Sequence, residues 1–356
     1  MMILSGRPPR GRTLQALVIA VTLALALAPF LFPGVKPLNV AAKVCVYALL
    51  GASYDLLLGY AGMVSFAHVM FFGVGSYGVG LALYGLGPSW GAVALGLAAG
   101  LAVSTLLALA IGLFSLRVQA IFFTMVTLAV SYAFNVLASQ LDWLTGGEDG
   151  RSFRVPEILQ PGFRLIDREA FGVALGGRQV SYYLVLVGCV VVFLALLRIV
   201  NSPFGRVLEA IRENPFRAEA LGYRIVFHRT LATCLAAAGA TFAGALNALW
   251  LRYVGPDTAL AGSIQIATLV VVVIGGMGTL YGAILGAALF VVAQNYLQTL
   301  LGAVSTAAGD AGLPLLRGLF HPDRWLLWLG LLFILVVYFA PAGLVGALSR
   351  EDDTTP

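Results

Sequence analysis

The sequence predicts an all-α integral membrane protein, a polytopic bundle of about 8–10 transmembrane helices. Of its 356 residues, 60% are apolar and only 10% are charged, whereas a soluble domain carries about 25% charged residues. Such a chain cannot cover a water-facing surface, so most of its surface must face lipid. The 42 glycines indicate helices that pack closely through small residues, because lipid provides no hydrophobic drive between helices.

Ten apolar runs are each near the roughly 20 residues that cross about 30 Å of hydrocarbon. In chain order they are Leu14–Phe32, Ala41–Leu58, Ala61–Leu86, Ala92–Leu116, Val118–Gln140, Tyr182–Val200, Thr230–Tyr253, Leu260–Met277, Thr279–Leu301 and Trp325–Leu348. The third and the eighth are rich in glycine or short. Either of them can be broken or re-entrant, so the count lies between eight and ten.

The arginines before the first run set the expected orientation. Arg7, Arg10 and Arg12 favour a cytoplasmic N-terminal tail of residues 1–13, followed by a transmembrane domain of residues 14–348. A cleaved signal peptide is the less favoured alternative, because the apolar run is long and more spans follow at once. The basic segment 198–229 supports the same orientation, so residues 349–356 form a second cytoplasmic tail.

Two long segments interrupt the spans. Residues 141–181 carry turn signals at Gly146-Gly147, Pro161-Gly162 and Gly176-Gly177. They predict a small folded cap outside the membrane, with a hairpin as one option. The basic residues lie at span ends and in loops, which indicates topology and not nucleic-acid binding. Three cysteines lie inside apolar runs without a CxxC spacing, so neither a metal nor another cofactor is expected.

The cytoplasmic segment 201–229 predicts a helix, a tight turn and a second helix. Ser202-Pro203 and Asn214-Pro215 each place a capping residue before a proline at the first helical position. The first helix should therefore end near Glu213 or Asn214, and Gly222 can terminate the second.

The first of these two helices has two different faces. Val207, Leu208 and Ile211 form an apolar stripe, while a separate face carries charged residues. From these residues alone, either a docking surface for a soluble partner or a passive interfacial hairpin remains open.

The segment GRVLEAIRENPFRAEALGY, residues 205–223, resembles the cytoplasmic coupling loop of ABC importer permeases, and most closely those of the branched-chain amino acid (LivM-type) family. Further blocks match that family in order across most of the chain. They are LLLGYAGMVSFAHVMFFGVGSYG at 56–78, LTGGEDG at 144–150, LATCLAAAGATFAGALNALWLRYVGPD at 231–257, VVVVIGGMGTLYGAILGAAL at 270–289 and APAGL at 340–344.

The resemblance implies a permease subunit of the bacterial inner membrane that moves branched-chain or related amino acids. Its expected partners are two cytoplasmic ATP-binding subunits, a second related permease subunit, an extracytoplasmic solute-binding protein and membrane lipid. Urea, short amides and aromatic acids are alternative solutes within the family. The residues expected to couple to the ATPase are Arg206, Glu209, Arg212, Glu213, Asn214, Pro215, Arg217, Glu219 and Gly222.

Other classes of function have less support. A phosphate-binding loop needs a Gly-Lys-[Ser/Thr] ending, which the chain lacks, so ATP hydrolysis is expected on a separate chain. HExxH and GxSxG motifs are also missing, which argues against a membrane-embedded enzyme. The rival of a different class is a self-sufficient ion-coupled transporter, for which Asp55 is the only clear intramembrane acid.

Five polar residues inside the spans are candidates for the translocation path. Asp55 is either a path or gate contact, or a carboxylate bonded to nearby backbone close to the interface. Ser65 and His68 match the family's usual Gly-Gln-x-Ser-x-Gly-His pattern, although Met63 and Ala67 depart from it. Each is either a path contact or a packing residue. Asn247 and Gln265 either bond between helices or line the path.

Overall fold

The computed structural model describes residues 12–31, 34–114, 120–163, 176–310, 314–340 and 342–352. Ten segments in these ranges are helical, long and apolar enough to cross a membrane. The predicted polytopic helical bundle is therefore confirmed.

The long helices and the shorter elements alternate along the chain. The long helices are α1 (Arg12–Leu31), α2 (Val35–Asp55), α3 (His68–Leu86), α4 (Trp90–Phe114), α5 (Ala120–Gln140), α7 (Gly177–Val200), α10 (Ile225–Leu251), α12 (Gly262–Gly275), α13 (Leu280–Asp310) and α15 (Trp325–Phe339). The short ones are the π-helical turn η1 (Leu56–Tyr60), α6 (Asp142–Thr145), η2 (Gly147–Asp149), β1 (Arg151–Ser152), η3 (Glu157–Leu159), α8 (Pro203–Glu213), α9 (Pro215–Ala220), β2 (Tyr253–Val254), α11 (Pro256–Ala259), α14 (Pro314–Leu319), η4 (Pro322–Arg324) and α16 (Gly343–Asp352).

Helices α2 and α10 form the centre of the bundle. Of the 18 consecutive residues that make up the apolar stretch of the second span, which contains α2, 94% are buried. The corresponding share is 22% in the spans of α1 and α5. Helix α10 packs against α2, α3, α4 and α7. Glycines allow the closest of these approaches, because a Cβ at Gly244 would overlap the backbone carbonyl of Phe72 and one at Gly75 would overlap that of Thr241.

This contact predicts that Gly244→Val lowers the free energy of unfolding by about 1–3 kcal/mol, since the added side chain forces α3 and α10 apart. Thermal unfolding of the purified chain in detergent would measure the loss. The matched control is Gly330→Val on α15, where a Cβ would meet no atom within 4 Å. Equal melting temperatures for the two variants would contradict the close packing of α3 and α10.

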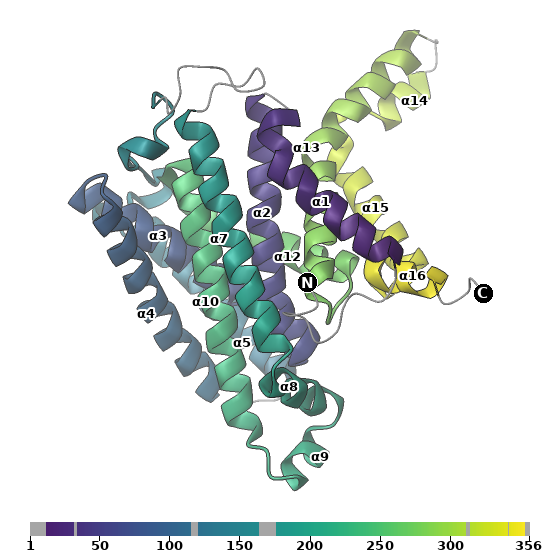
Figure 1. The fold of residues 1–356 in the computed structure, drawn as a ribbon. Coiled ribbons are helices and arrows are strands. Elements are labelled where there is room, and N and C mark those ends of the chain that lie inside the picture. The colour runs from purple at the N-terminus through teal and green to yellow at the C-terminus, as the bar shows by residue number, and fades with distance from the viewer. Residues whose placement is uncertain are drawn as a thin grey trace.

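The two predicted long loops lie at opposite ends of the bundle. Figure 1 shows α8 and α9 at one end and the short elements after α5 at the other, with α14 on this second side. The hairpin considered for residues 141–181 is not found in its described part. Instead β1 pairs antiparallel with β2, which follows α10 (Arg151↔Val254). Residues 164–175 lie outside the described residues.

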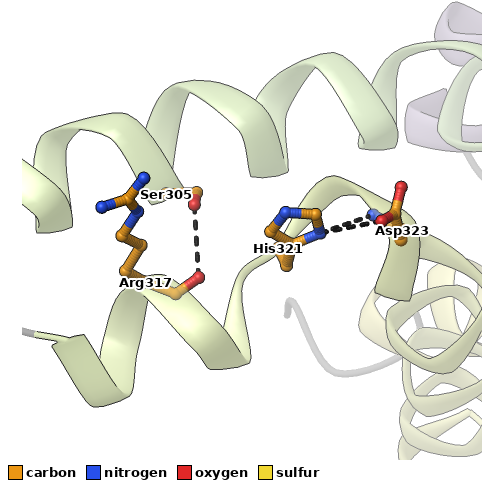
Figure 2. Close-up of polar contacts among 4 residues, drawn as sticks. All are labelled: Ser305, Arg317, His321 and Asp323. Atoms are coloured by element: carbon orange, nitrogen blue, oxygen red, sulfur yellow. Dashed lines mark hydrogen bonds and ion pairs between the residues drawn. The ribbon is translucent and has the colours of Figure 1, made fainter.

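The segment between α13 and α15 folds back on α13. Figure 2 shows Oγ of Ser305 on α13 donating to the backbone oxygen of Arg317 on α14, at 3.2 Å. Nδ1 of His321 lies 3.1 Å from Oδ2 of Asp323, but both side chains are more than half exposed. This ion pair therefore adds little to stability.

Several predicted span boundaries are wrong. The second span covers Val35–Tyr60 and not Ala41–Leu58, and the eighth covers Pro256–Gly275 and not Leu260–Met277. The third helix begins at His68 and not at Ala61. Residues 61–67 are not helical, and Gly62 has φ +67°, a conformation that favours glycine. We call residues 61–67 the strap.

Candidate coupling and translocation site

Residues 201–229 form the predicted helical hairpin. Helix α8 begins at Pro203 after Ser202 and ends at Glu213. The predicted cap at Ser202 is wrong, because its Oγ donates to the backbone oxygen of Ile199 at 2.6 Å and not to α8. Oδ1 of Asn214 accepts a hydrogen bond from the backbone nitrogen of Arg217 at 3.0 Å and so caps α9. Gly222 follows α9 with φ +92°. The cap at Asn214 involves residues only three positions apart, which is why the sequence alone predicts it.

Helix α8 packs its apolar stripe against the bundle, and charged side chains lie on its exposed face. Leu208 and Ile211 are fully buried, whereas Arg206 and Glu213 are exposed. The predicted division into two faces is confirmed.

Three apolar side chains at the tip of the hairpin were missed by sequence reasoning. Phe216 is 83% exposed, Leu221 72% and Tyr223 42%. We call these three residues the hairpin tip. Large apolar side chains exposed outside the membrane-spanning segments are typical of a surface that binds another protein. The signal was present in the sequence as apolar residues between polar ones around the second helix of the hairpin.

Arg212 connects α8 to the end of the second span. Its Nη1 donates a hydrogen bond to the backbone oxygen of Gly59 in η1. The stem of the same side chain packs on Gly62, where an added Cβ would lie 2.7 Å from Cγ of Arg212. Gly59 also lies against Gly278, because a Cβ at Gly59 would overlap the backbone nitrogen of Gly278.

Asp55, the last residue of α2, bonds to the same glycine, Gly278, that Gly59 contacts. Its Oδ1 accepts a hydrogen bond from the backbone nitrogen of Gly278 at 2.8 Å, and Asp55 is only 1% exposed. Gly278 lies in the tight turn between α12 and α13, with φ +80°. Asp55, Gly59, Gly278 and Arg212 together form what we call the joint. Asp55 thus bonds to nearby backbone, and a role of Asp55 in the path or gate stays a prediction.

Side chains from α5 and α12 hold the strap. Oγ1 of Thr124 donates to the backbone oxygen of Val64 at 3.1 Å, and Oγ1 of Thr127 accepts from the backbone nitrogen of Phe66 at 3.1 Å. Gln265 on α12 bonds to the backbone at the junction of the strap and α3. Its Oε1 accepts from the nitrogen of Val69 at 3.0 Å, and its Nε2 donates to the oxygen of Ser65 at 3.4 Å.

The predicted path residues Ser65 and His68 lie inside this support. Both are 1% exposed. Nε2 of His68 lies 2.8 Å from Oγ of Ser53 on α2, and its ring centroid is 5.2 Å from that of Tyr54. The structure therefore brings Ser65, His68 and Gln265 together around the strap. Asn247 is half-buried on α10.

Lys43, one of the basic residues interpreted from the sequence as topology signals, lies inside the second span. Lys43 lies on α2, and its Nζ donates to Oε1 of Gln294 on α13 at 2.8 Å. The ring of Tyr47 lies 5.6 Å from the same Nζ. Within the described ranges, no group of three or more His, Cys, Asp and Glu residues could hold a metal ion.

A helical hairpin joined to a bundle of apolar helices agrees with the comparison to known families. A family model described as the permease component of the branched-chain amino acid transport system matches residues 36–340. The chain belongs to this family. The resemblance carried by the sequence blocks is thereby confirmed.

Two members of the family are similar to the chain at comparable levels. The high-affinity branched-chain amino acid transport system permease protein LivM of Salmonella typhimurium is 29% identical over 286 residues, which cover 76% of this chain and 66% of the relative. LivM of Escherichia coli is 28% identical over a stretch of the same length and coverage. The chain therefore spans just under two thirds of the length of these curated relatives.

A more distant relative is the probable branched-chain amino acid transport permease protein LivM of Methanocaldococcus jannaschii. It is 27% identical over 165 residues, which cover 46% of this chain and 45% of the relative. No solved structure matches the chain.

Proposed function

We propose that the chain is the permease subunit of an ABC importer that moves branched-chain or related amino acids across the inner membrane. The relatives carry that transport in their names, and the family model covers most of the chain. Two separate ATP-binding subunits would supply the energy, and a second related permease subunit would complete the path. An external solute-binding protein would deliver the solute, with the described part of residues 141–181 as its docking place. Both termini are then cytoplasmic.

The joint is the observation that carries this proposal. Arg212 on α8 bonds to Gly59 at the end of the second span, and Gly59 lies against Gly278 between α12 and α13. A displacement of α8 by a bound ATPase would therefore move two membrane elements at once. Close-packed elements transmit such displacements instead of absorbing them.

The hairpin carries the residues that would meet the ATPase. The charged and capping members of this surface are Arg206, Glu209, Glu213, Asn214, Pro215, Arg217, Glu219 and Gly222. The hairpin tip adds apolar area, which is the part of an interface that commonly holds the strongest contacts.

Measurement of ATPase activity in the assembled complex tests this function. The chain would be co-expressed with its partners, and vanadate-sensitive ATP hydrolysis and solute uptake would be measured in liposomes. We expect Glu213→Ala combined with Arg217→Ala to uncouple or release the ATPase while the permease stays folded. Uptake by this chain alone, without ATP and indifferent to the double substitution, would instead establish an ion-coupled transporter.

A separate prediction concerns the hairpin tip. Phe216→Ala is expected to weaken binding of the ATPase subunit about tenfold or more, because it removes an exposed aromatic ring that anchors the contact. Co-purification and titration of the labelled ATPase subunit would measure the affinity. Trp143→Ala is the matched control, since Trp143 is 76% exposed but belongs to α6, one of the short elements after α5 and not part of the hairpin. Equal affinities for both variants would place the ATPase elsewhere.

A further inference from the structure

We infer that the outer face of the strap and the adjoining flank of α5 line the water-filled path of the solute. This inference rests on the proposed importer function and deepens it by naming the lining. The buried residues Ser65, His68 and Gln265 then act as supports that position the strap, and the solute meets the residues on its other face.

The strap has an inner and an outer face. Ala61, Met63, Ser65 and Ala67 are buried, while Gly62 and Val64 are exposed and Phe66 is half-buried. Buried and exposed residues therefore alternate along the strap, although Ala61 and Ala67 have helical dihedral angles and Gly62 has a positive φ. The outer face is thus open on the surface of the single chain.

The strap lies beside the last turns of the second span, which is long and apolar enough to cross a membrane. It starts after Tyr60 at the end of the second span. It ends at Ala67, just before His68, whose Nε2 contacts Ser53. Ser53 precedes Tyr60 by seven residues, which corresponds to about 10 Å along a helix. The strap therefore rises from the end of the second span into the bundle.

Backbone of this kind cannot face lipid. In hydrocarbon each unsatisfied N–H or C=O group costs several kcal/mol, so non-helical backbone at this depth is buried in protein or borders water. Among the described residues, the backbone N–H groups of Gly62 and Val64 donate no hydrogen bond to another backbone group. Both residues are exposed, so the N–H groups need water or a polar solute.

Helix α5 extends the same face. Thr124 and Thr127 bond to the strap, and helical spacing places Ile121, Leu128 and Tyr132 on the flank that carries Thr124. These three side chains are 72%, 52% and 70% exposed. The strap thus offers polar backbone groups beside apolar side chains. That combination suits a solute with a charged ammonium and carboxylate and an apolar side chain.

Cysteine accessibility in the assembled complex tests the lining. In a chain whose three cysteines are replaced by alanine, Val64→Cys and Leu128→Cys would each be exposed to a charged, membrane-impermeant methanethiosulfonate from both sides. The controls are Leu23→Cys on α1 and Val187→Cys on α7, at positions that are 56% and 58% exposed. We expect the two lining positions to react about tenfold or more faster than the controls, because thiols in hydrocarbon do not ionise.

The rate should also change when the ATPase is trapped with vanadate, because the path changes its access. Reaction of the lining positions only with a lipid-soluble maleimide would overturn the inference. So would a rate that vanadate leaves unchanged in a complex that transports. Phe66→Cys is the substitute if Val64→Cys does not fold. Fast labelling in a complex without ATP-driven uptake would refute the importer function but retain the contact with water.

Discussion

Replacing Arg212 with alanine is expected to reduce ATP-driven uptake by the assembled complex about tenfold or more, with much of the ATP hydrolysis retained. The reason is that Arg212 bonds α8 to Gly59 and packs along Gly62. A hydrogen bond from a charged group contributes about 1.5–3 kcal/mol. Without it, movement of the hairpin would no longer reach η1. Uptake and ATP hydrolysis measured in the same proteoliposomes would give the ratio of solute moved to ATP consumed.

Two further variants make this test specific. Arg198→Ala removes an exposed arginine at the same end of the bundle and is expected to keep the normal ratio. Arg212→Lys keeps the charge but not the planar, forked donor, so it should recover only part of the coupling. An unchanged ratio in Arg212→Ala would show that force reaches the membrane through other contacts of α8.

Asp55 gives the second large expected effect, and here the chemistry of the substitution decides between two classes of transporter. Oδ1 of Asp55 accepts from the backbone nitrogen of Gly278, and an asparagine supplies the same acceptor without charge. We therefore expect Asp55→Asn to transport at about the wild-type rate. Asp55→Leu leaves a buried N–H unpaired, which costs about 1–3 kcal/mol and should reduce uptake about tenfold.

Uptake measured across a range of external pH and sodium concentrations provides the check on both variants. An ion-coupled transporter that uses Asp55 to carry a proton or sodium ion would fail with asparagine as completely as with leucine. Loss of uptake in Asp55→Asn, with the protein folded and its ATPase bound, would therefore contradict the structural role of Asp55 in the joint.

The sequence predicts the parts of this fold that depend on neighbouring residues. Composition and apolar run length predict the spans, because a helix in lipid satisfies its own backbone. The hairpin of α8 and α9 is predictable because its signals also lie close together in the sequence. The cap at Asn214 acts within one helical turn.

The joint and the strap could not be predicted in this way. Asp55 and Gly278 are separated by 223 positions, and Gln265 lies 196 positions from Val69, whose backbone it holds. Such contacts appear only when the helices are placed beside one another. The pairing of β1 with β2 was missed for the same reason, since two-residue strands have no periodicity of their own.

The central place of α10 has a consequence for how the chain is made. This helix of 27 residues is the seventh of the ten candidate spans, and it packs against four helices that precede it. During synthesis α2, α3, α4 and α7 would enter the membrane before the helix that holds them together exists. The face of α3 around Gly75 packs against Thr241 of α10 in the finished bundle. Before α10 is made, this face remains in contact with lipid or with the insertion machinery. Assembly of the bundle therefore follows insertion as a second stage, and a ribosome that stalls before residue 225 would leave six spans without a core.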